Sequence, residues 1–129
     1  VGLSPTPCWR RVRQLETAGY IRKRVALLDR DLLGVGTTVF VSIRTKTHAA
    51  DWLTKFAKVV QSMPEVIEFH RMSGDIDYLM KVVVPDIPAY DAFYKRLISA
   101  IDLSDVSSSF AMEEIKATTT LPLTYLKET

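Results

Sequence analysis

The sequence predicts an α+β domain whose strands and helices follow the order β-α-β-β-α-β. Residues 66–84 hold two strand-length apolar runs around a Ser73-Gly74-Asp75 turn. Residues 49–63 and 86–101 repeat apolar residues at helical spacing, and residues 37–45 are rich in β-branched residues. Two helices covering one face of a four-stranded sheet form the split βαβ, or ferredoxin-like, arrangement.

The N-terminal segment predicts a helix of about four turns over residues 4–19. Ser4 suits the N-cap, Pro5 the first helical position and Gly19 the position after the last turn. An apolar side that would face a core is formed by Cys8, Trp9, Val12 and Leu15.

Charge is concentrated near the N-terminus. Residues 1–30 hold seven basic and two acidic residues, a net charge of +5, whereas the remaining residues hold 10 basic and 13 acidic, a net charge of −3. This asymmetry is typical of a polyanion-binding arm on a neutral-to-acidic body, although basic runs also occur as plain solvated surfaces. A helix start followed at once by arginines suits contacts with phosphates, and an amphipathic surface helix is the alternative.

Between this helix and the first strand of the domain, residues 20–28 predict a short strand. Asp29 is expected to cap a one-turn helix over residues 31–33, which Gly34 ends. Gly34 and Gly36 mark a domain boundary, and the strand over residues 37–45 follows.

The rest of the chain continues the alternation. Pro64 ends the helix over residues 49–63, and Asp86 caps the helix that follows the hairpin. A final strand is predicted over residues 106–117, with an edge strand or tail over residues 121–126.

One sheet face is left without helices in this arrangement. Strands with apolar residues on both sides need cover on both, so we expect this face to pack against a second copy of the chain. The residues expected there, or their alternates along the strands, are Phe40, Ile43, Phe69 and Tyr78.

The turn of the hairpin is a candidate binding site. It places backbone N–H groups within a few residues of the carboxylates of Asp75 and Asp77, a combination that can hold a small zwitterion such as an amino acid. The plainer interpretation is a solvated acidic hairpin tip.

Other chemistry has little support in the sequence. The histidines, His48 and His70, lack the paired spacing of a zinc site, and no glycine-rich phosphate loop or dinucleotide motif occurs, so neither a metal nor a cofactor is predicted. Glu113 and Glu114 would point to opposite faces of a strand. An enzyme is therefore not predicted. A single cysteine, Cys8, and the absence of a membrane-length apolar run favour the cytoplasm.

Three segments resemble the Lrp/AsnC family, the feast/famine transcriptional regulators. The second half of its helix-turn-helix is similar to VGLSPTPCWRRVRQLETAGYI, and its ligand-responsive domain, sometimes called RAM, is similar to MSGDIDYLMKVVVPDIPAY and FAMEEIK. The family pattern has two further helices before Val1, so we expect residues 1–129 alone to bind DNA weakly or not at all. The expected domains are the C-terminal part of the helix-turn-helix (1–20), a linker strand and short helix (21–36), and the βαββαβ effector-binding and oligomerisation domain (37–129).

The resemblance implies a DNA-binding regulator that responds to a small effector, usually an amino acid, bound where the hairpin turn of one dimer meets its neighbour. It also implies that dimers assemble into tetramers or octamers. The alternative is a stand-alone amino-acid-sensing module that does not bind DNA. The residues expected to contact DNA are Ser4, Pro5, Thr6, Arg10, Arg11 and Arg13. Those matching the effector turn are Met72, Ser73, Gly74, Asp75, Asp77 and Tyr78, with Met72, Ile87 and Phe110 expected to select the effector's side chain.

Overall fold

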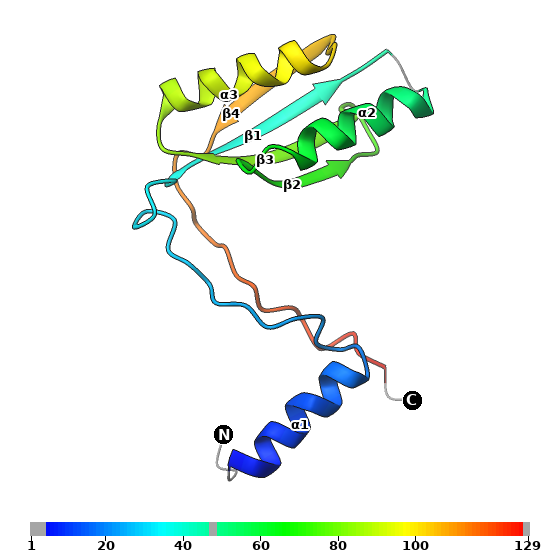
Figure 1. Ribbon diagram of the computed structural model, residues 1–129, viewed down its shortest axis with the longest axis vertical. Coiled ribbons are helices and arrows are strands. Elements are labelled where there is room, and N and C mark those ends of the chain that lie inside the picture. Colours follow the sequence, from blue (N-terminus) through cyan, green and yellow to red (C-terminus); the bar gives the residue numbers. More distant parts are fainter. Residues whose placement is uncertain (1–4, 47–48, 128–129) are drawn as a thin grey trace.

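A computed structural model describes residues 5–46 and 49–127 of the chain. It confirms the α+β fold and the βαββαβ order, preceded by one helix at the end of a long linker (Figure 1). The elements are α1 (Pro5–Thr17), β1 (Thr37–Arg44), α2 (Ala50–Gln61), β2 (Val66–Arg71), β3 (Tyr78–Val84), α3 (Ile87–Ala100) and β4 (Asp105–Phe110).

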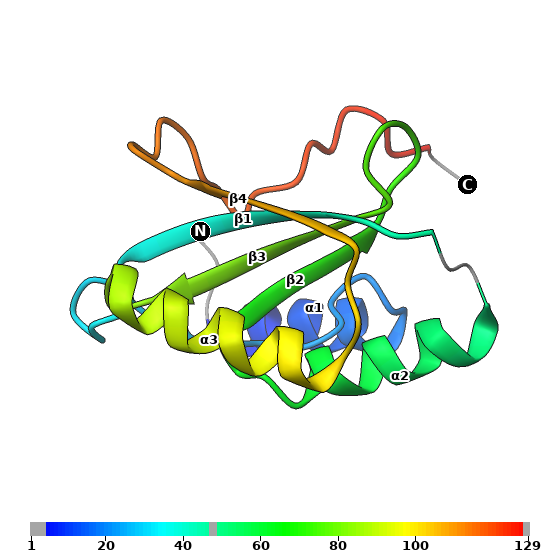
Figure 2. The ribbon, with the colours of Figure 1, turned by 90° about the horizontal axis from the view of Figure 1, so that it is seen from above.

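The four strands form one antiparallel sheet in the order β2-β3-β1-β4. Strand β1 lies in the interior of the sheet, so Val41 is opposite Met80 of β3 on one side and Ser108 of β4 on the other. Both α2 and α3 cover the same face, and the chain after β4 passes on the opposite side (Figure 2). We call the face without helices the open face.

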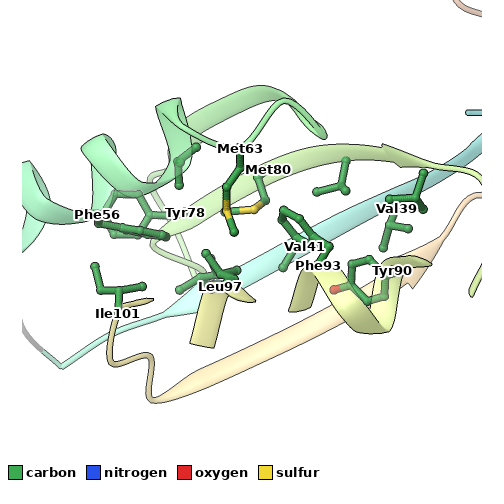
Figure 3. Packing of buried hydrophobic residues seen from close by; sticks show 14 residues of the cluster. Val39, Val41, Phe56, Met63, Tyr78, Met80, Tyr90, Phe93, Leu97 and Ile101 are labelled. Atoms are coloured by element: carbon green, nitrogen blue, oxygen red, sulfur yellow. The ribbon is translucent and has the colours of Figure 1, made fainter. Parts of the chain in front are cut away.

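The core lies between the sheet and these two helices. Alternate residues of β1, namely Val39, Val41 and Ile43, are completely buried there, as a period of two along a strand requires. From α2, Phe56 packs edge-on against the ring of Phe69, with 4.9 Å between ring centroids. Figure 3 shows side chains from both helices meeting those of the strands in a single cluster.

Three of the four residues expected on the open face lie in this core instead. Ile43 is fully buried, Tyr78 is 5% exposed, and the ring of Phe69 stacks on that of Tyr78 at 5.6 Å. Only Phe40 lies on the open face, where it is 39% exposed. The sequence could not decide between the two faces, because aromatic and β-branched residues occupy both parities of these strands.

The ends of the helices follow the predicted signals. The carboxylate of Asp86 accepts a hydrogen bond of 2.9 Å from the backbone N–H of Ala89 and so caps α3. Pro64 follows the end of α2. Gly19, with φ of 89°, follows the last turn of α1. The proposed N-cap Ser4 lies outside the described residues.

One predicted strand is wrong and another is too long. Residues 20–28 are not a strand, and β4 ends at Phe110 rather than at residue 117. Of the two alternatives for residues 121–126, an edge strand or a tail, the structure has the tail. The reason is the lack of a neighbour. Strand β4 pairs with β1 up to Val39, and beyond the hydrogen bond from Ala111 N–H to Thr38 O the described residues offer it no further backbone partner. Because residues 113–114 are outside any strand, the argument that Glu113 and Glu114 point to opposite faces also fails.

The predicted one-turn helix after Asp29 is a hydrogen-bonded turn. The carboxylate of Asp29 caps the turn as expected, accepting hydrogen bonds from the backbone N–H groups of Asp31 at 2.9 Å and Leu32 at 3.1 Å. Gly34, with φ of 76°, ends the turn.

The hairpin is anchored to the end of β1 through one residue. The backbone N–H of Asp77 donates to Ile43 O at 2.9 Å, and its carboxylate accepts from the N–H of Thr45 at 2.8 Å. The N–H of Met72 donates to Asp77 O at 2.8 Å and closes the base of the turn. Asp77 therefore holds the turn at a defined position beside β1.

We predict that Asp77→Ala lowers the free energy of unfolding by roughly 1 to 3 kcal/mol, because it removes a partly buried, charged acceptor. Asp75→Ala, at the exposed tip, should change it by no more than about 0.5 kcal/mol. Urea denaturation followed by circular dichroism measures both. Equal effects of the two substitutions would contradict the anchoring role of Asp77.

Candidate functional site

The tip of the β2–β3 hairpin is exposed. Met72 is 37% exposed, and Ser73, Gly74 and Asp75 are also at the surface. Gly74 has φ of 111°, a conformation that side chains other than glycine rarely adopt. Within the described part of the chain the Asp75 carboxylate accepts no hydrogen bond and forms no ion pair, so it is available to a ligand.

The other two residues predicted for this site, Asp77 and Tyr78, already make contacts that stabilise the fold. The carboxylate of Asp77 is already engaged by the N–H of Thr45, and Tyr78 packs in the core against Trp52 and Phe56. The tertiary structure thus separates two carboxylates that the sequence could not tell apart. Asp75 faces solvent, whereas Asp77 supports the turn from beneath.

The residues expected to select the effector's side chain are not all brought together. Ile87 begins α3, after the far end of β3, and Phe110 is opposite Val39, which in turn pairs with Val82. Figure 1 shows the hairpin turn and the start of α3 at opposite ends of the sheet. Only Met72 adjoins the turn within one protomer, because β3 separates it from the other two by about 20 Å.

The predicted DNA-contacting arginines, Arg10, Arg11 and Arg13, are all exposed on α1. The guanidinium of Arg13 lies 4.7 Å from the centroid of the Trp9 ring. No acidic residue occurs in the first turn of α1, so its helix dipole is free to attract phosphate. Pro5 and Thr6 lie in that turn, and Ser4 lies outside the described residues.

The apolar side of α1 is only partly covered by the described residues. Trp9 is 55% exposed and Leu15 is 43% exposed, and α1 lies at the far end of the linker, away from the sheet (Figure 1). The prediction that this side faces a core is therefore not met within the described residues. Its spacing is that of a helix whose partners are other helices.

A groove of about 800 Å³ on the open face was not predicted from the sequence. We call it the tail groove, because the chain after β4 forms one of its walls. Its floor includes Phe40 and Lys81, and the linker turn forms the opposite wall. No local signal could have revealed it, since its walls are some eighty residues apart. The lining residues are 28–31, Gly36, Thr38, Phe40, Lys81 and 111–117.

Charged residues also pair on the open face. The Glu68 carboxylate lies 3.1 Å from His70 Nε2 and 3.6 Å from Lys81 Nζ. The hydrogen bond with His70 and the charge of Lys81 hold the pKa of Glu68 below its usual value. In the described residues no group of three or more metal-ligating side chains gathers, and no helix there is long and apolar enough to cross a membrane.

Comparison with known families matches both ends of the chain. The model described as Lrp/AsnC ligand binding domain matches residues 38–121, and the one described as winged helix-turn-helix DNA-binding matches residues 1–22. The second match places α1 and its flanking residues in a helix-turn-helix.

Curated relatives agree. The chain is 54% identical over 122 residues to the glutamate uptake regulatory protein of Zymomonas mobilis, covering 95% of this chain and 74% of that protein. It is 52% identical over 124 residues to the DNA-binding transcriptional activator DecR of Escherichia coli K12, covering 95% and 82%.

Solved structures share the fold. An AsnC family transcriptional regulator from Agrobacterium tumefaciens has a TM-score of 0.90 and 62% identity, covering 98% of this chain and 82% of that one. The Neisseria meningitidis transcriptional regulator NMB0573, solved as a complex with L-Met, has a TM-score of 0.87 and 38% identity, covering 97% and 81%. With both family models matched in order along one chain, this protein belongs to the Lrp/AsnC family of DNA-binding transcriptional regulators.

Proposed function

We propose that this regulator senses an amino acid at the β2–β3 turn and reads DNA through α1. The observation that carries the proposal is the exposed turn, which offers backbone N–H groups around Gly74 and an uncommitted carboxylate at Asp75. The proposed division of the chain is a helix-turn-helix part (1–20), a linker (21–36) and an effector-binding and oligomerisation domain (37–129).

At the effector site, N–H groups around Gly74 would hold the α-carboxylate and Asp75 the α-ammonium group. The related Neisseria protein was solved with L-Met, which supports an amino acid as the ligand class. Met72 supplies the apolar contact in the same protomer, while Asp77 and Tyr78 hold the turn in shape. Contacts from Ile87 or Phe110 would have to come from another protomer, since both lie at the other end of the sheet.

At the DNA interface, α1 is the proposed recognition helix. Its exposed arginines would neutralise phosphates, and its N-terminal residues Ser4, Pro5 and Thr6 would approach the backbone and groove edges. The helix-turn-helix match over residues 1–22 supports this role, and so does the DNA-binding activator among the relatives.

Self-association is also proposed, through the open face and the segments beside it. Large apolar side chains in the linker and the tail are exposed in the single chain, a condition that a stable monomer avoids. A second copy would cover them together with Phe40, and such dimers could join into tetramers or octamers. Among them are Leu27 (72%), Leu28 (70%), Leu32 (86%), Met112 (95%) and Ile115 (88%).

We further propose that the protein is not an enzyme and works in the cytoplasm, where its DNA target would be found. The curated relatives named above are transcriptional regulators, which supports both statements.

For DNA binding, we predict that Arg10→Ala, Arg11→Ala and Arg13→Ala in the full-length protein each weaken binding to a random-sequence 30-bp duplex. Each lost phosphate contact should also reduce the slope of log affinity against log salt by about 0.9. Fluorescence anisotropy over a salt series measures both. Arg44→Ala, an exposed arginine at the other end of the molecule, is the control and should change neither. An absence of DNA binding by the unaltered protein would favour the stand-alone sensing module.

For the effector, we predict that at least one of the twenty amino acids raises the thermal midpoint of the full-length protein, and that Asp75→Asn abolishes this increase. The reason is that the substitution removes the charge that would pair with the ammonium group. Isothermal titration calorimetry with the amino acid found then gives the loss of affinity. Asp102→Asn, an exposed carboxylate in another loop, is the matched control. Equal affinity of the Asp75→Asn variant and the unaltered protein would remove the site.

For assembly, we predict that Phe40→Glu reduces the mass in solution, because it places a charge in the middle of the open face. Ile98→Glu on α3 is the control, since Ile98 is exposed to a similar extent (43%, against 39% for Phe40) but lies on the helical side of the domain. Sedimentation velocity on both variants measures the mass. An unchanged mass for Phe40→Glu would argue against the open face as the interface.

A further inference from the structure

Thr38 of β1 is the point where the linker and the tail both join the domain. Its hydroxyl accepts a hydrogen bond of 2.7 Å from Arg30 Nη1, and its carbonyl accepts one of 2.9 Å from the N–H of Ala111. The other terminal nitrogen of Arg30 lies 2.7 Å from the Glu114 carboxylate. One guanidinium therefore joins three segments: the linker turn, the central strand and the tail.

The backbone of Arg30 is also held in place. Arg30 lies within the turn capped by Asp29, and its carbonyl accepts from the N–H of Val35 at 2.9 Å. Thr38 is only 8% exposed, and the Arg30 side chain is 32% exposed. Because both backbones are fixed, the fork of Arg30 has little freedom once its two acceptors are in place.

The other end of the linker is attached to the helix. The N–H of Ile21 donates to Leu15 O, and Arg24 lies 3.5 Å from the Glu16 carboxylate. Between Arg24 and Asp29, residues 25–28 form no hydrogen bond or ion pair within the described chain. The direction in which α1 leaves the domain thus depends on this short stretch and on how firmly the turn at Arg30 is held.

We propose that Arg30 is a positioning residue for the recognition helix. By joining the linker turn to Thr38 and to Glu114 of the tail, it sets the direction of the linker and so the placement of α1 relative to the effector domain. The purpose of this placement, DNA binding, rests on the proposed function. The contacts of Arg30 themselves do not depend on DNA. Arg30 contacts no DNA in this role and acts through the linker.

The test measures the distance from α1 to the domain. In the full-length protein with Cys8→Ser, spin labels are attached at Thr17→Cys, at the end of α1, and at Lys55→Cys, on the exposed side of α2. Labelled protein is mixed with excess unlabelled protein so that each assembly carries one labelled protomer. Double electron–electron resonance then gives the distribution of distances within that protomer.

Arg30→Met should broaden this distribution while the thermal midpoint of the domain changes little. Thr38→Val removes one acceptor and Glu114→Gln removes the charge of the other, both without altering Arg30, and each should broaden it less. Arg30→Lys, which keeps the charge but loses the fork, should be intermediate. Arg44→Met is the control, because Arg44 is an exposed arginine at the far end of β1, on the same face of that strand as Thr38, and its loss should leave the distribution unchanged.

DNA affinity separates this role from a phosphate contact. Arg30→Met should weaken binding to the random duplex several-fold without reducing the salt slope, whereas loss of a phosphate contact reduces it. A reduced slope, or a distribution unchanged by Arg30→Met and Glu114→Gln, would overturn the proposal. If the distribution broadens but the unaltered protein binds no DNA, the positioning stands and the proposed DNA-binding function fails.

Discussion

Strand β1 is the element on which the rest of this molecule depends. Its alternate residues Val39, Val41 and Ile43 are completely buried against α2 and α3, and its backbone pairs with a strand on each side. Its two ends hold the functional parts. At one end, Ile43 and Thr45 bind Asp77 and so position the hairpin turn, and at the other Thr38 binds the linker and the tail. Since the hairpin turn, the linker and the tail are all attached to this one strand, a change in its packing reaches all three segments.

In the hairpin turn, two aspartates have different surroundings and therefore different roles. Asp75 and Asp77 are two residues apart, yet Asp75 faces water without a partner among the described residues, whereas Asp77 is fixed beneath the turn by a backbone N–H. A fixed support with an uncommitted carboxylate above it is a preorganised arrangement, which would lower the ordering cost of binding at the proposed effector site. Gly74 also contributes, because its positive φ keeps backbone N–H groups at the tip without strain.

Large parts of the chain are shaped for contacts that a single protomer does not supply. The apolar side of α1, the linker leucines and the tail carry exposed large side chains, whereas the βαββαβ domain has a complete core. The buried core of the domain therefore contains no residue of α1, the linker or the tail. The guanidinium of Arg30 is the exception, because it fastens linker and tail to the domain within one chain.

Local patterns in the sequence determined the elements of this protein: the Gly74 turn, the Asp86 cap, the helical spacing before Pro64 and the Gly19 stop all act within a few residues, so each is readable from the chain alone. Contacts between segments distant in sequence could not be predicted from the sequence. Only the tertiary structure decided that Ile43, Phe69 and Tyr78 face the helices, that β4 stops where β1 offers no more backbone to pair with, and that Asp77 is engaged while Asp75 is not. It also joined Arg30 to Glu114 across 84 residues. The physical reason is that propensity and periodicity are local, whereas sheet pairing, burial and ion pairs depend on which distant segments meet.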